Sequence, residues 1–226
     1  MRKTDKPKVI RIVPPEAPDT DGYAAEPPDL AGTWVHEDVR LRDADLADAD
    51  APRVQLERIV MERVGLARAN LKAAVVQDGR LDGCDLAGSA WERAHLTRVV
   101  MDGCRLVGAD FARATFRDAR VREANAEMAM FVGAVFTAAR FDRCNLRGAS
   151  FEGADLRNVV FRRCDLRTAD LRGARLDGAD LRGSQIAGAG LDVGGLRGVI
   201  LDPGQALEVV EQMGVKVKPL EEGEEE

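Results

Sequence analysis

The sequence predicts an all-β fold in which the chain winds as a coil and successive coils stack in parallel. Two observations predict it. A large apolar residue (Leu, Phe, Ile, Val, Met or Trp) occupies 31 of the 33 positions found at every fifth residue from Leu41 to Leu201, and only Ala51 and Ala126 depart from this rule. The residue two before each of these positions is always small or β-branched, and 18 of the 33 are alanine.

A period of five excludes an amphipathic α-helix, because successive large residues would be spread around the whole helix. Residues two apart share one face of an extended strand, so each unit offers a small and a large residue to the same side. The chain must then bend after each unit to keep that side inward. Glycine, which tolerates the required corner conformation, stands two after the large residue at twelve units: Gly83, Gly88, Gly103, Gly108, Gly133, Gly148, Gly153, Gly173, Gly178, Gly183, Gly188 and Gly198.

Units such as Ala44-Asp45-Leu46, Ala109-Asp110-Phe111 and Ala179-Asp180-Leu181 resemble the repeat of the pentapeptide-repeat family. The resemblance implies a right-handed quadrilateral parallel β-helix, a β-solenoid in which four of these units make one coil. Thirty-three units then make about eight coils and a rod about 40 Å long, since parallel strands lie about 4.8 Å apart.

The four cysteines support a coil of four units. Cys84, Cys104, Cys144 and Cys164 all stand at the small inward position, and successive cysteines are one, two and one such coils apart. They are therefore expected in one column, as small buried residues filling an alanine-sized space. Their Cβ vectors would run side by side, so we expect free thiols and no disulfide.

Both ends of the chain differ from the repeat. Residues 1–38 are expected to form an N-terminal extension, with a short strand over Val9–Val13, a proline-rich linker over Pro14–Pro28, and a cap that includes Trp34 and Val35. Residues 39–201 form the β-helix. In residues 202–226, Asp202 and Pro203 begin a capping helix that ends before Gly214, and an acidic tail follows. Three apolar residues of that helix are assigned to the cap or, as the resemblance implies, to a homodimer contact: Leu207, Val210 and Met213.

Charge is distributed unevenly along the chain. The formal net charge is −6, made up of −3 over residues 1–38, +3 over residues 39–201 and −6 over residues 202–226. The sequence contains neither an apolar run long enough to span a membrane nor a signal peptide, so a cytoplasmic location is expected.

Residues for catalysis are missing from the pattern. The chain has two histidines, His36 and His95, with no Ser/His/Asp or Cys/His arrangement around them, and no Cys-x-x-Cys spacing for zinc. A core filled by interlocking small and large residues leaves no room for a pocket. The sequence therefore predicts a protein that is not an enzyme and has no cofactor and no metal site.

Two outward-facing groups are candidate partner-binding surfaces. Met128 and Met130 lie close to the missing core residue at Ala126, and they form either an apolar patch or a plug that turns inward to fill the gap. The other group is a stripe of seven arginines against three acidic residues, a formal +4, which is either a binding surface or an ordinary solvated face: Arg120, Arg122, Arg140, Arg143, Arg162, Arg163 and Arg182, with Glu123, Asp142 and Asp180.

These observations lead to a non-catalytic protein-interaction module that presents a rigid rod to a protein partner. An alternative follows from the resemblance alone: some pentapeptide-repeat proteins bind DNA gyrase as DNA mimics and protect it from quinolones or other gyrase poisons. The +3 charge of residues 39–201 argues against mimicry of an anionic duplex. Direct nucleic-acid binding by the arginine stripe is a third hypothesis.

Overall fold

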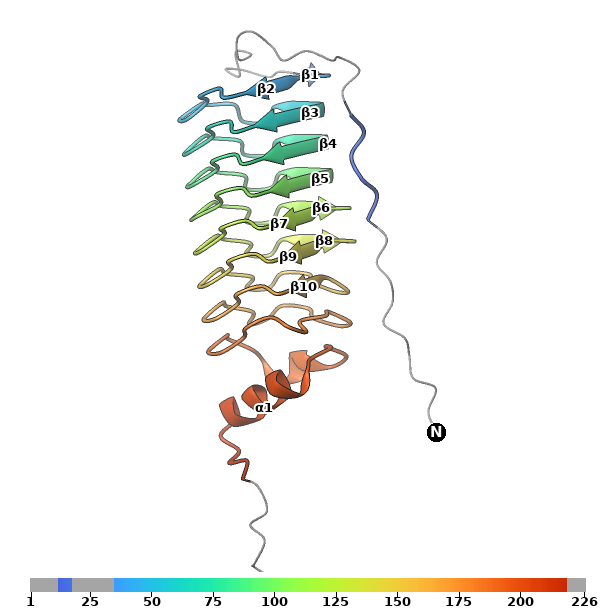
Figure 1. Ribbon diagram of the computed structural model, residues 1–226, viewed down its shortest axis with the longest axis vertical. Helices are drawn as coiled ribbons and strands as arrows, with labels where there is room; N and C mark the ends of the chain where they lie inside the picture. Colours follow the sequence, from blue (N-terminus) through green and yellow to red (C-terminus); the bar gives the residue numbers. More distant parts are fainter. Residues whose placement is uncertain (1–11, 18–34, 219–226) are drawn as a thin grey trace, which may run out of the picture.

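The computed structural model describes residues 12–17 and 35–218. Residues 35–201 form a stack of coils with one short α-helix at its C-terminal end (Figure 1). Residues 12–17 run along the outside of this stack without forming a strand. The part of the expected N-terminal strand that is described, Ile12–Val13, is thus not strand, and Val9–Arg11 and Trp34 lie outside the described residues.

The strands stack in parallel, and each residue pairs with the residue four units further along the chain. Val35 pairs with Gln55, Gln55 with Val75, and Val75 with His95. The expected coil length is therefore confirmed. The strands are β1 (Val35–Glu37), β2 (Arg40–Arg42), β3 (Gln55–Glu62), β4 (Val75–Asp82), β5 (His95–Asp102), β6 (Thr115–Arg117), β7 (Arg120–Arg122), β8 (Val135–Thr137), β9 (Arg140–Asp142) and β10 (Val160–Arg162).

The number of coils built from regular strands is smaller than the eight expected. Strands β1 to β9 account for about six turns, and β10 is the last strand. Beyond it, single bridges such as Asp165↔Gln185 and Asp180↔Ile200 continue the register. These bridges come from the same small-large units, but their paired stretches are too short to count as strands.

The core consists of the repeating small and large residues. Every large position from Leu41 to Ile186 is buried, and Ala51 and Ala126 are fully buried as well. In the middle of the rod several large residues are phenylalanines stacked between coils, with ring centroids 4.8 Å apart for Phe131 and Phe151. All four cysteines are buried and free, as expected.

The corners have a left-handed backbone conformation whether or not glycine is present. All twelve corner glycines have positive φ, as predicted, but so do twenty other corner residues, including Met128 and Asp78, both with φ 58°. A side chain in this conformation costs about 1–2 kcal/mol. Most corners are nevertheless held, because the corner N–H bonds to a carbonyl of the next coil, as Met128 N does to Arg147 O at 3.0 Å. Gly173 N and Gly183 N bond instead to the carboxylates of Asp192 and Asp202.

A 3-10 turn over Val193–Leu196 and helix α1 (Pro203–Gln212) close the C-terminal end. Asp202 caps α1 as expected. Gln205 and Val209 are its buried residues, whereas Leu207 and Met213 are exposed and Val210 is half-buried. Gln205 Nε2 donates to Leu181 O and Ser184 O, both at 2.6 Å. Ser184 O has no further coil to bond to, whereas Leu181 O also accepts from Ser184 N at 3.1 Å.

Candidate partner-binding surface

Five of the seven candidate arginines converge on one groove. Arg140 lies on β9, Arg162 ends β10, Arg143 and Arg163 occupy the corners that follow these strands, and Arg182 lies on the next coil. The groove has a volume of about 500 Å³ and is also lined by Asp142, Asp180 and Gly183. Five arginines and two aspartates give it a formal charge of +3. Arg120 and Arg122, on β7, are not among its lining residues.

Most of the arginines are held by carboxylates of the same face. Arg140 Nη2 donates to Asp142 Oδ1 at 2.6 Å, and Arg182 Nη2 donates to Asp180 Oδ2 at 2.7 Å. Arg143 donates to Glu123 on the preceding coil. Arg122 pairs with Asp102 in the same way, outside the groove. These pairs fix the guanidinium groups in place and reduce the charge that the stripe offers to a ligand.

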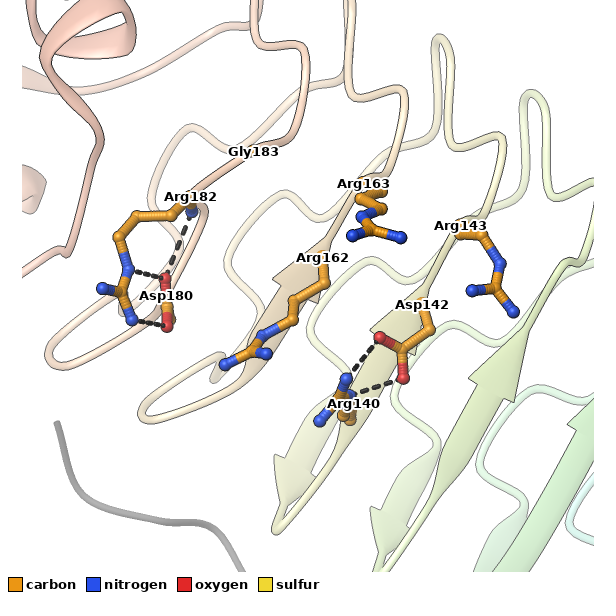
Figure 2. A pocket seen from close by; sticks show the side chains of 8 residues that line it. All are labelled: Arg140, Asp142, Arg143, Arg162, Arg163, Asp180, Arg182 and Gly183. Carbon is orange, nitrogen blue, oxygen red and sulfur yellow. Dashed lines mark hydrogen bonds and ion pairs between the residues drawn. The ribbon is translucent and has the colours of Figure 1, made fainter.

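Arg162 and Arg163 make no ion pair within residues 12–17 and 35–218, and both are exposed. Parallel pairing sets Arg162 beside Asp142, but that carboxylate is engaged by Arg140 of its own strand. Figure 2 shows Arg162 extended between the Arg140–Asp142 and Arg182–Asp180 pairs, with Arg143 and Arg163 along the adjoining corner. The two unpaired guanidinium groups therefore present their donors to the groove.

The corner formed by Arg143 and Arg163 separates this groove from a second one. The second groove has a volume of about 340 Å³ and is lined by both arginines together with Asn145, Asp165 and Gln185, among others. An acidic segment can therefore reach the Arg143–Arg163 corner from the groove on either side. The same guanidinium groups would then contact it by fork-shaped hydrogen bonds.

Asp180 of the groove is a poor general base. The hydrogen bond from Arg182 lowers the pKa of Asp180, so this carboxylate is ionised at neutral pH. The carboxylate beside Arg140 raises the pKa of that guanidinium further above its usual range. With arginine always charged, the groove offers fixed positive charge and hydrogen-bond donors, which suits binding of anionic groups.

The second candidate surface is an apolar patch on a single coil. Met128 and Met130 are both exposed, so the alternative in which a methionine turns inward to fill the space at Ala126 is wrong. Met128 points away because its corner conformation directs the side chain outward, where its sulfur lies close to Gly148. Val132 and Val135 of the same coil are exposed as well.

Two further properties concern only the described residues. Among them, no three His, Cys, Asp or Glu side chains lie together as metal ligands would. In the same part of the chain, no helix has the length and apolar character needed to cross a bilayer.

The fold and surface define a class: a parallel β-solenoid of five-residue units with a filled core. Residues 76–151 match the family described as pentapeptide repeat region, and residues 144–183 match the family described as pentapeptide repeats (8 copies). Together these matches identify residues 76–183 as pentapeptide repeats. This agrees with the family resemblance found in the sequence.

Several solved structures are similar at low identity. HetL, a protein involved in heterocyst differentiation regulation from the cyanobacterium Nostoc, is 22% identical with a TM-score of 0.41, and the match covers 72% of this chain and 84% of HetL. QnrB1, a plasmid-mediated fluoroquinolone resistance protein, is 24% identical with a TM-score of 0.39, over 78% of this chain and 99% of QnrB1. A pentapeptide repeat protein from the Arabidopsis thaliana thylakoid lumen is 22% identical with a TM-score of 0.25, over 51% and 70% of the two chains. No functionally curated protein matches the sequence.

Proposed function

We propose that this chain is a non-catalytic, cytoplasmic protein-interaction module whose arginine-lined groove binds an acidic segment of a protein partner. The observation that carries the proposal is the pair of exposed, unpaired guanidinium groups of Arg162 and Arg163 within a groove of formal charge +3. The groove is carried on a rod with a packed core, so its backbone is in place before the partner arrives. Binding then orders two exposed side chains and requires little change of the backbone.

An acidic peptide fits the groove better than a duplex does. The positive charge is confined to a few coils, and other arginines of the face are neutralised by their own carboxylates. Binding to DNA gains most of its free energy from many phosphate contacts along the duplex. A short acidic segment needs only the few guanidinium groups that the groove provides.

Fluorescence anisotropy with a labelled ten-residue glutamate-rich peptide tests the proposal. The full-length chain is expected to bind the peptide in low salt, and Arg143→Glu/Arg163→Glu is expected to weaken binding by at least about tenfold, since two favourable charges become repulsive. A labelled 20-bp DNA duplex in the same assay distinguishes a nucleic-acid ligand. Tighter binding to the duplex than to the peptide would replace the proposal with the nucleic-acid hypothesis.

The chain offers a matched control for this variant. Arg93 and Arg113 are also exposed corner arginines one coil apart, with positive φ, but they lie at a different corner of the rod. Arg93→Glu/Arg113→Glu changes the net charge by the same amount and is expected to leave peptide binding within about twofold of wild type. An equal loss in both variants would mean that overall charge, and not the groove, attracts the peptide.

The alternative is binding of DNA gyrase by DNA mimicry. Mimicry needs a continuous row of unpaired carboxylates, whereas carboxylates such as Asp155, Asp165 and Asp170 are each bound by an arginine two residues later. A gyrase supercoiling assay with and without a fluoroquinolone tests this alternative. Protection of the enzyme by the wild-type chain would establish it, and no effect at micromolar protein would remove it.

The exposed side of α1 supports a homodimer as the assembly of this module. Leu207 and Met213 are exposed on this helix, with Val210 half-buried beside them. If they join two rods, Leu207→Glu is expected to convert a dimer into a monomer. Sedimentation equilibrium measures the oligomeric state of the wild-type chain and of Leu207→Glu. A wild-type chain that is monomeric at about 100 µM would reject the dimer.

A further inference from the structure

Residues 12–17 contact one corner of the rod through their main chain. Val13 N donates to Asp118 Oδ1 at 3.3 Å, and Glu16 N donates to Asp78 Oδ1 at 3.0 Å. Figure 1 shows this segment running beside the strands, and its direction is opposite to the progress of the coils. Pro14 and Pro15, which lie between these two donors, have no N–H. From Val13 to Glu16, therefore, every main-chain N–H of the segment bonds to the corner.

The corner itself is a fixed row of charges. Arg98 Nε donates to Asp78 Oδ1 at 2.6 Å, and Asp118 lies one coil beyond Arg98. Asp78 is 1% exposed. Burial acts to raise the pKa of Asp78, but the hydrogen bonds from Arg98 and from Glu16 N outweigh it and lower the pKa overall. The carboxylate is therefore ionised and ready to accept a main-chain donor.

The spacing of these acceptors matches one conformation of the peptide. Asp78 and Asp118 are two coils apart, which is about 9.6 Å at the usual distance between parallel strands. A polyproline II helix rises about 3.1 Å per residue and has three residues per turn. Val13 and Glu16 are three residues apart, so their N–H groups would lie about 9.3 Å apart on the same side of such a helix.

The burial pattern of the segment has the same period of three. Ile12 and Pro15 are half-buried, whereas Val13, Pro14 and Glu16 are exposed. Ile12 and Pro15 are one polyproline II turn apart, so one apolar edge of the segment packs on the rod. The hydrogen bonds and the packing thus both repeat with the period of that helix.

We propose that the corner formed by Asp78, Arg98 and Asp118 is a binding site for a proline-containing peptide in the polyproline II conformation. In this chain residues 12–17 are its resident ligand. The site recognises two main-chain N–H groups separated by two prolines, which cannot compete for the carboxylates. It is separate from the arginine-lined groove and does not depend on the function proposed for that groove.

Release of the resident segment in the full-length chain tests the site. Val13→Pro/Glu16→Pro removes both donors while the rod is unchanged. A labelled peptide with the sequence of residues 12–17 is expected to bind this variant at least about tenfold more tightly than wild type, where the tethered segment occupies the site at a millimolar effective concentration. Val13→Ala/Glu16→Ala keeps both N–H groups and is expected to behave like wild type.

A further substitution locates the peptide on the rod. Adding Asp118→Ala to the released variant removes one acceptor and is expected to weaken peptide binding by about tenfold. Thermal unfolding by circular dichroism confirms that each variant is folded. The site does not exist if the released variant fails to bind the peptide, if the alanine control binds it equally well, or if Asp118→Ala makes no difference.

Discussion

The N-terminal and C-terminal halves of the rod obey the same repeat but differ in backbone and core. Strands β3, β4 and β5 each have eight residues and continue across a corner, whereas the later strands have three. The inward residue after that corner is Ile59, Gly79 or Val99 in the long strands and alanine at positions 119 and 139. β-Branched residues favour extended backbone, which accounts for two of the three long strands.

The cores of the two halves are filled by different side chains. The N-terminal half is filled mainly by Leu, Met, Val and Trp91, around an apolar cavity of about 10 Å³, which is room for at most one water molecule. From the middle of the rod onward, phenylalanines stack from coil to coil, as Phe116 and Phe136 do with their ring centroids 4.6 Å apart. Units of the C-terminal half pair with their counterparts one coil away although their strands are short or absent, because the core beneath them is continuous. The arginine-lined groove lies on this half of the rod.

Phe131→Ala is expected to have the largest effect on stability. Phe131 is buried between Phe111 and Phe151, with ring centroids 5.3 and 4.8 Å away, so its loss opens a cavity in the middle of the stack. The free energy of unfolding should fall by about 3–5 kcal/mol, measured by urea denaturation. Leu71→Ala, at the matching position of the N-terminal half, should cost less. The opposite order would contradict the role given to the aromatic stack.

Gln205→Ala tests how the C-terminal half is closed. Loss of this side chain leaves the carbonyl of Ser184 without its donor, while Leu181 O keeps the bond from Ser184 N, and the loss should cost about 1–3 kcal/mol. Hydrogen exchange over residues 181–190 is expected to accelerate more than exchange in β3–β5. Exposed Gln212 is the control, and its replacement by alanine should change stability by less than about 0.5 kcal/mol. Equal effects of the two substitutions would mean that the cap does not act through these bonds.

The strain of the left-handed corners is tested by adding a side chain at one corner glycine and by removing the side chain at another corner. Gly153 has φ +63° and no atom within 4 Å of an added Cβ, so Gly153→Ala isolates the backbone strain. It should destabilise the rod by about 1 kcal/mol. Met128→Gly, at φ 58°, should not destabilise it by more than a few tenths of a kcal/mol. Thermal unfolding compares the two, and a tolerated Gly153→Ala would show that the corners are not strained.

Acid titration is expected to have the smallest effect. The folded-state pKa of Asp180 is lowered by Arg182, so this pair stabilises the fold above the unfolded pKa of about 3.9, and the contribution is lost as pH falls through the folded pKa. Asp180→Asn should therefore be less stable than wild type at pH 7, by at most about 1 kcal/mol, and the gap should close toward pH 2. Urea denaturation across this range checks it. A gap that is independent of pH would contradict the assignment.

The sequence was sufficient to predict the fold, because a small and a large residue recur in every five over 33 units and no helix or flat sheet can bury such a pattern. It also identified the arginines that line the groove, since residues one coil apart fall on the same face. It could not tell which of them are neutralised. Arg140 binds Asp142 of its own strand, and this choice, which leaves Arg162 unpaired, depends on side-chain conformation.

Other features were missed because their signals are short or ambiguous. Gln205 reads as an ordinary polar helix residue, and only the end of the coil stack gives it two carbonyls to bond. Nothing in the repeat marks Asp78 and Asp118 as acceptors for the N-terminal segment. The proline content of this region predicts a linker that includes Pro14 and Pro15, although the same residues suit a docked polyproline II segment.

The central claim is that this rod acts through the arginine-lined groove of its C-terminal half. Parallel affinity capture from a lysate of the source organism with the wild-type chain, Arg143→Glu/Arg163→Glu and Arg93→Glu/Arg113→Glu tests it most directly. The account predicts an acidic protein retained by wild type and by the Arg93/Arg113 control and lost with the Arg143/Arg163 variant. Retention of the same proteins by all three chains would contradict it.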